Sequence, residues 1–143
     1  MAQFDVQQFY LARASFLRIL GETQMASGAI DDALVSAELA LRTNPDELLW
    51  RSGALILRGV LRLKRAQTEL AEADFRDAIA LARSMSAKAW ELRATTSLAR
   101  LLDNTGRREE ARATLGGIYN WFTEGFDTAD LKEAKALLNE LGT

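Results

Sequence analysis

The sequence predicts an all-α fold built from seven helices, and three observations support this prediction. Apolar residues recur every three or four positions along most of the chain, as they do on one face of a helix. The chain holds one Pro and nine Gly in 143 residues, so few residues interrupt these runs. Alternating segments of β-branched residues, which form strands, are almost absent.

The first three helices are predicted in the N-terminal half. The first covers residues 4–26 and ends at Ser27-Gly28, and the second covers residues 30–41. The segment Asn44-Pro45-Asp46-Glu47 marks a helix start, because Asn is a preferred N-cap, Pro suits the first helical position and Glu can complete a capping box. A third helix should therefore begin there and run to about Lys64.

Four more helices follow in the C-terminal half. Thr68 can cap a fourth helix that runs to about Ser84, and residues 88–119 form two helices joined by a tight turn at Gly106. Thr128 is the predicted N-cap of a last helix that ends near Leu141. No linker or low-complexity segment divides these helices, so residues 1–143 are expected to form one domain.

Small residues recur at matching positions of successive helix pairs, with offsets of 38 and 40 residues. Three sets align, namely Gly21, Gly59 and Ala99, then Ala33, Ala71 and Ala111, then Ala40, Ala78 and Ile118. Small residues let two helices cross at the short end of the usual interaxial range, about 8–10 Å. No pair can bury its apolar stripe alone, so the pattern predicts three stacked pairs, over about 9–44, 46–84 and 86–122, and a capping helix at 128–141.

The first unit resembles the tetratricopeptide repeat (TPR), because Leu20-Gly21, Gly28, Ala33, Ala40 and Pro45 fall at the spacing of that motif. The resemblance implies a right-handed α-solenoid of three helix pairs plus the capping helix. Residues 75–138 also resemble the C-terminal repeats of large bacterial regulators that contain a nucleotide-cyclase or transcriptional domain and an ATPase. The chain is therefore expected to be the terminal regulatory segment of such a protein or a free-standing relative.

The composition argues against catalysis. There is no Cys and no His, which removes disulfides, thiolate nucleophiles, imidazole bases and nearly every zinc or haem site. The Gly116-Gly117 pair lies within a helical pattern and lacks the features of a phosphate-binding loop. The paired acids occupy first turns of helices, where the helix dipole explains them; they are Asp31/Asp32, Glu69/Glu72/Asp74 and Glu109/Glu110. We expect no enzymatic activity, no cofactor and no metal.

The net charge of -2 gives no general attraction to nucleic acid or to an anionic membrane. The N-terminal residues lack the apolar run of a signal peptide, and no apolar stretch is long enough to span a bilayer. We expect a cytoplasmic protein that binds neither nucleic acid nor membrane.

In stacked repeats the first helix of each pair lines the concave side. A groove that binds another protein or a peptide is therefore predicted, with a regulatory role. Some TPR domains grip peptide carboxylates with a Lys-Asn-Asn-Lys-Arg set, but here Glu22, Leu57 and Ser97 fill three of those positions, so this activity is not expected. The predicted groove residues are Arg18, Glu22, Ile56, Val60, Leu63, Arg93, Ser97, Arg100, Asp103 and Asn104.

Two further features each allow two interpretations. Arg51, Arg58, Arg62 and Arg65 form a basic stripe, which we expect to pair with Glu69, Asp74 and Asp77 of the next helix. The alternative is an acidic or phosphate-bearing partner. The aromatic residues Trp121, Phe122 and Phe126 are expected to seal the end of the repeats, and the alternative is a ligand-binding cluster.

Two alternative functions stay open. Phe4, Phe9 and Phe16 have no preceding helix to cover them, so the first pair can self-associate into a homodimer through an exposed apolar patch. A ligand-sensing role for an attached cyclase or ATPase is the other alternative.

Overall fold

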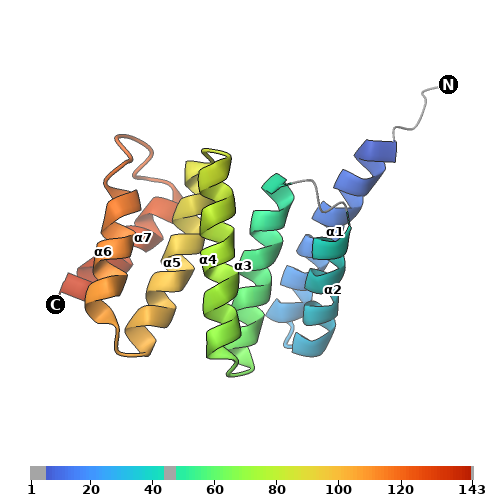
Figure 1. Cartoon of the computed structure of the whole chain (residues 1–143), viewed down its shortest axis with the longest axis horizontal. Coiled ribbons are helices and arrows are strands. Elements are labelled where there is room, and N and C mark those ends of the chain that lie inside the picture. Colours follow the sequence, from blue (N-terminus) through green and yellow to red (C-terminus); the bar gives the residue numbers. More distant parts are fainter. Residues whose placement is uncertain (1–5, 44–47, 143) are drawn as a thin grey trace.

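The computed structural model describes residues 6–43 and 48–142, and within them the chain contains seven helices and no strand. The predicted all-α class is therefore confirmed for these residues. Figure 1 shows α3, α4 and α5 side by side in the centre, with α1 and α2 at one end of the molecule and α6 and α7 at the other. They are α1 (Val6–Ala26), α2 (Ile30–Arg42), α3 (Leu48–Lys64), α4 (Thr68–Ser84), α5 (Lys88–Asn104), α6 (Arg108–Tyr119) and α7 (Ala129–Gly142).

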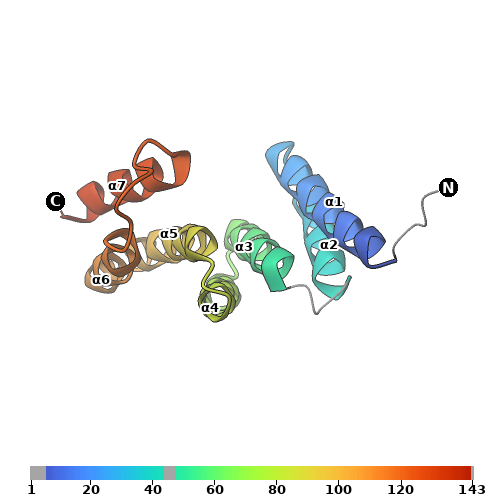
Figure 2. The same cartoon turned by 90° about the horizontal axis from the view of Figure 1, so that it is seen from above.

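The helices form two layers. Each helix packs against the next one in the chain, and α1 also contacts α3, α3 contacts α5, and α5 contacts α7. Figure 2 shows the odd-numbered helices along one side and α2, α4 and α6 along the other. In this view α1 and α7 stand above the two ends of the row formed by α3 and α5, so the face of the odd-numbered helices curves inward.

Four tight turns end their helices in the same way. Each contains one residue with a positive φ angle, namely Gly28, Ala66, Ser86 or Gly106. The next amide donates a hydrogen bond to the carbonyl five residues earlier, as from Ala29 to Gln24 (2.8 Å) and from Gln67 to Arg62 (2.8 Å). This pattern satisfies carbonyl groups that a helix end leaves without a partner. Glycine was the predicted signal at two of these turns, and the other two form without it.

The predicted helix starts have different outcomes. The cap at residues 44–47 lies outside the described residues. Thr68 is not a cap, because it is already the first residue of α4 and Gln67 holds the N-cap position without a side-chain hydrogen bond. Helix α7 begins directly after Thr128, as predicted, and the Thr128 hydroxyl donates to the Gly125 carbonyl at 2.7 Å.

The small residues at the predicted crossings are closely packed. A Cβ atom added at Gly21 would lie 2.8 Å from Leu57 Cδ2 of α3 and 3.4 Å from the Ala33 carbonyl oxygen, so Gly21 makes room for the Leu57 side chain as well as for the predicted crossing of α1 and α2. A Cβ atom added at Gly59 would lie 2.5 Å from the ring of Phe75, so Gly59 makes room for an aromatic ring and not for a second small residue. Ala99, at the third crossing, is fully buried.

A buried ion-pair cluster joins α2, α3 and α4. The Asp74 side chain is 2% exposed and accepts hydrogen bonds from Arg58 Nε (3.0 Å) and from Arg62 Nη1 (2.9 Å). Arg58 also pairs with Glu38 at 3.3 Å. Burial acts to lower the pKa of Arg58, but its bonds to Asp74 and the charges of both acids raise it above its ordinary value. This arginine therefore stays charged inside the cluster.

The rest of the basic stripe uses different partners from those predicted. Arg65 pairs with Asp31, and Arg51 donates to the Leu41 carbonyl at 3.0 Å. In the described structure, no ion pair joins the stripe to Glu69 or to Asp77. The pairing with Asp74 was predicted correctly. The contacts of the stripe with Asp31, Glu38 and Leu41 were not predicted, and they arise because α2 also packs against α3.

A second cluster joins α4 to the start of α6. Arg76 pairs with Glu110 at 3.0 Å, and Arg107 pairs with Glu72 at 2.7 Å. Hydrogen bonds from Arg76 and Arg107 lower the pKa of Glu110. Burial acts to raise the pKa of Glu72, but bonds from the same two arginines outweigh it, so that pKa is also lowered. Both carboxylates therefore stay ionised at neutral pH and connect α4 to the start of α6.

Candidate functional site: a groove along the odd-numbered helices

The first hollow on the inward-curving face has a volume of about 230 Å³. Residues of α1, α3 and α5 line it, and apolar side chains of α3 lie between charged side chains of α1 and α5. The lining residues are Arg18, Glu22, Met25, Gly53, Ile56, Leu57, Val60, Trp90 and Arg93.

A second hollow of about 210 Å³ continues toward the C-terminus, between α3, α5 and α7. It is lined by Ile56, Arg93, Thr96, Ser97, Asp130 and Glu133. Ile56 and Arg93 line both hollows. The two hollows therefore form one surface, called the groove below, that crosses all four odd-numbered helices.

A glycine in the middle of α3 brings the walls of the groove together. A Cβ atom added at Gly53 would lie 3.0 Å from Arg18 Cδ and 3.0 Å from the Trp90 ring. Because Gly53 has no side chain, α1 and α5 can both place large side chains over α3. The floor of the groove is therefore formed by the stem of Arg18 and the ring of Trp90.

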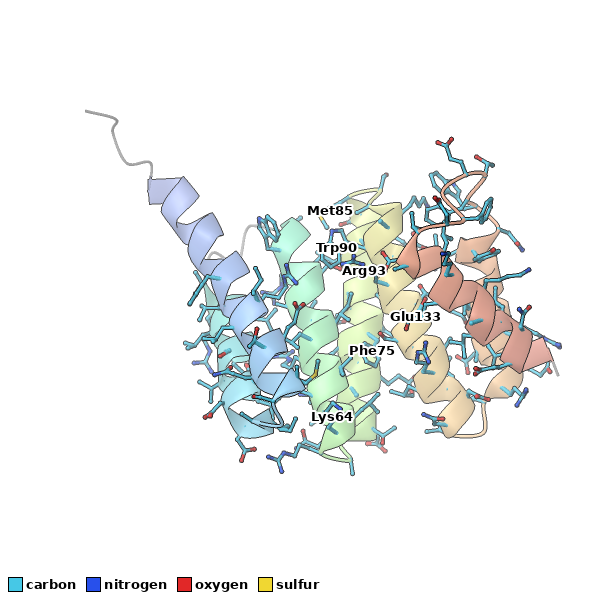
Figure 3. The ribbon with its side chains drawn as sticks, turned by 180° about the vertical axis from the view of Figure 1, so that it is seen from behind. Lys64, Phe75, Met85, Trp90, Arg93 and Glu133 are labelled. Carbon is cyan, nitrogen blue, oxygen red and sulfur yellow. The ribbon has the colours of Figure 1, made fainter. Side chains whose placement is uncertain are left out.

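The groove arginines are paired within the chain. Arg18 Nη1 lies 2.6 Å from Glu22 Oε1, and Arg93 Nε donates to Asp130 Oδ2 at 2.8 Å. The guanidinium carbon of Arg93 also lies 5.0 Å from the centre of the Trp90 ring, within range of a cation–π interaction. Figure 3 shows this face of the molecule and labels Trp90, Arg93 and Glu133.

At the α7 side, Arg100 Nη2 donates to Glu133 Oε1 at 2.7 Å. Positive and negative groups therefore alternate along the groove, and neither sign dominates. Such a surface recognises a partner through shape and through mixed polar and apolar contacts, because it offers no field of one sign.

The structure brings together six of the ten predicted groove residues. The residues that line the two hollows are Arg18, Glu22, Ile56, Val60, Arg93 and Ser97. Arg100 does not line them, but it forms an ion pair with Glu133, which does. The other three lie elsewhere. Leu63 packs against the apolar core, Asp103 is 3.6 Å from Arg108 of α6, and Asn104 is exposed at the end of α5.

Sequence reasoning missed the contribution of α7 to the groove. Asp130 and Glu133 of α7 pair with Arg93 and Arg100 of α5, although neither acid was among the predicted groove residues. A signal existed, because Asp130 follows Arg93 by 37 residues and Arg93 follows Ile56 by the same interval. Trp90 was also missed as a groove residue.

The aromatic residues at the two ends differ from expectation. Phe122 is half-buried and packs against the core, as predicted, but Trp121 is 56% exposed and Phe126 is 45% exposed, so neither seals the end of the fold. At the other end Phe16 is 61% exposed. Phe4 and the side chain of Phe9 lie outside the described residues.

Within the described residues, no helix is both long enough and apolar enough to cross a membrane, and no group of three or more acidic side chains is placed to hold a metal ion.

Comparisons with known proteins leave the family of this chain unassigned. The TPR resemblance stays a prediction, since neither a protein-family model nor a curated protein sequence matches this chain.

Proposed function

We propose that the chain is a non-catalytic, TPR-like α-solenoid that binds a peptide or protein segment in the groove. The observation that carries this proposal is the continuity of the two hollows through Ile56 and Arg93. A continuous surface across four helices suits an extended segment better than a compact small molecule, because the segment can contact each helix in turn.

The pattern of helix contacts supports the solenoid part of the proposal. Both helices of each pair contact the first helix of the next pair, and contacts between odd-numbered helices recur from α1 to α7. A repeat array needs this arrangement, because each hairpin exposes an apolar stripe that only its neighbour can cover. The TPR resemblance adds a regulatory role, as the terminal part of a larger regulator or as a separate protein.

The lining of the groove indicates the kind of partner. Ile56, Val60 and Trp90 offer apolar contacts, and the ion pairs at Glu22 and Asp130 lie beside them. A partner with one or two apolar anchors flanked by polar residues of both signs would match this surface. Anchors of this kind supply most of the affinity in peptide recognition.

A matched pair of valine substitutions tests the groove. Peptides are first selected from a random displayed library against the wild-type chain, and their affinities are then measured for Val60→Glu and Val35→Glu. Val60 lines the groove, whereas Val35 is 59% exposed on α2, in the other layer. We expect Val60→Glu to weaken binding at least about tenfold, because the carboxylate must lose water at an apolar contact.

The control variant should bind like the wild type. Circular dichroism shows whether both variants keep the helical content of the wild type. If the selected peptides bind Val60→Glu and the wild type equally well, the partner does not occupy the groove and the proposal is wrong.

Self-association is a second candidate function, and one observation favours it. Phe16 and Ile19 of α1 are 61% and 51% exposed, whereas Ala54 and Leu57, at the equivalent positions of α3, are buried. In α3, Leu57 packs with Ala33 and Ala37 of the preceding pair. The same face of α1 is apolar and uncovered, so a second copy of the chain could cover it.

A further inference from the structure

A further hollow lies apart from the groove floor, between α5, the α6–α7 connection and the start of α7. Its volume is about 650 Å³, within the range of about 300–1,000 Å³ that is typical of small-molecule sites. It shares only Asp130 with the groove. The lining residues of this loop hollow are Ala89, Leu92, Trp121, Phe122, Thr123, Glu124, Gly125, Thr128, Asp130 and Leu131.

The loop hollow has an apolar base and an aromatic wall. Leu92 and Leu131 at its base are 1% and 3% exposed. Trp121 and Phe122 form a T-shaped pair with ring centres 5.1 Å apart. The base is fixed by core packing, but the Trp121 ring remains more than half exposed. A ligand that covered this ring would therefore remove apolar surface from water.

Only carboxylates supply charge to the lining. Residues 113–131 include three acids and no Lys or Arg. Asp130 gives one oxygen to Arg93, while the Glu124 carboxylate has no hydrogen bond or ion pair to any described residue. Lys88 lies 5.4 Å from the centre of the Trp121 ring, but it lines a neighbouring hollow with Arg83 and Glu91, and not this one.

We propose that the loop hollow binds a small organic cation with an apolar body and a single positive end. The body would lie against Trp121 and the two buried leucines, and the positive end would lie at Glu124. Contact with the exposed Trp121 ring removes apolar surface of the body from water, and the Glu124 carboxylate at the rim supplies a charge complementary to the positive end. This site is separate from the groove and does not depend on the groove having a partner.

Three probes that share one apolar body test the proposal. They are 4-phenylbutylamine, 4-phenylbutanol and 4-phenylbutanoate, which differ in the charge of one end. Each is titrated into the ¹⁵N-labelled chain, and amide shifts are followed by NMR. We expect the shifts to centre on residues 89–92 and 121–131. The amine should bind about threefold more tightly than the alcohol, as suits one partly exposed ion pair, and the carboxylate should bind most weakly.

Two charge variants locate the positive end. Glu124→Gln should remove the preference for the amine over the alcohol while leaving the affinity for the alcohol unchanged. Asp127→Asn is the matched control, because Asp127 lies in the same loop and does not line the hollow. This control should keep the preference. If both variants reduced it equally, a general negative field would explain the selectivity and the contact at Glu124 would be wrong.

Two aromatic variants locate the body. Trp121→Ala should weaken all three probes at least about fivefold, because it removes the wall of the hollow. Phe126→Ala removes a similarly exposed ring that is absent from the lining, and it should leave the affinities unchanged. The proposal is overturned if no probe shifts these amides up to its solubility limit, if the three probes bind equally, or if Trp121→Ala binds like the wild type.

Discussion

At the scale of single residues, the turns at Ala66 and Ser86 hold a conformation that neither residue prefers. Their φ angles are 59° and 54°, while Gly28 and Gly106 take φ angles of 86° and 81° in the other two turns. A residue with a Cβ atom loses about 1–2 kcal/mol in the left-handed region. Helix packing on both sides of each turn must offset this loss.

Replacing Ala66 with glycine should therefore stabilise the protein. Ala66→Gly removes the steric strain but increases the freedom of the unfolded chain, which costs about 0.4–1 kcal/mol. The net increase in the free energy of unfolding should be about 0.5–1 kcal/mol, measured by urea denaturation followed by circular dichroism. Ala73→Gly is the control. This residue is exposed within α4, so the variant should lose about 1 kcal/mol.

The two alanine variants should thus move stability in opposite directions. Equal losses would mean that Ala66 does not adopt a positive φ angle. The contrast also explains why the sequence predicted only part of the turn chemistry. Glycine marks Gly28 and Gly106, whereas nothing in the preferences of Ala66 or Ser86 signals a left-handed residue.

At the scale of helices, the apolar period predicted all seven helices of the described residues, because apolar side chains recur at helical spacing where a helix packs against its neighbours. The same period says little about which neighbour a polar side chain meets. Glu133 shares the polar side of α7, but the tilt of that helix over α5 places it against Arg100. In the same way, the residue type of Trp121 suggests a place in the core, but the side chain is exposed because of the path that the chain takes between α6 and α7.

Asp74 provides the clearest test of how helices are held together. It is buried in α4 and binds two arginines of α3, and removal of one member of a buried ionic cluster leaves uncompensated charge. Asp74→Asn should lower the free energy of unfolding by about 3 kcal/mol. This is the low end of the range for such changes, because Arg58 and Arg62 are each 19% exposed and can regain some water.

The control for this prediction is Asp77→Asn in the same helix. Asp77 is exposed, so the same chemical change should alter stability by less than about 0.5 kcal/mol. Both values come from denaturant unfolding at neutral pH. A loss below about 1 kcal/mol for Asp74→Asn would show that the cluster contributes no more than a surface ion pair.

At the scale of the whole molecule, the sequence located much of the groove but not the loop hollow. The repeat alignment located Arg18, Ile56 and Arg93 because each lies on the first helix of a predicted pair, and α3 contacts both α1 and α5. It could not locate the loop hollow. That space depends on the path of residues 120–128 between two helices, and no periodic signal governs such a path.

The exposed face of α1 leads to a prediction about the assembly of the whole chain. Burial of one Phe side chain contributes about 1.5–3 kcal/mol, and a two-fold contact would bury two copies of Phe16 and of Ile19 at once. Light scattering coupled to size exclusion should therefore give a mass that rises from one chain toward two as the concentration increases. Phe16→Asp should keep the mass of one chain at every concentration.

Phe126→Asp is the matched control for this experiment, because Phe126 is also exposed but lies near the opposite end of the fold. It should associate like the wild type. Association lost in both variants would place the contact elsewhere or would reflect general solubility. If the wild type stays at the mass of one chain across the whole range, the apolar face of α1 does not bind a second copy, and the groove remains the better supported site of interaction.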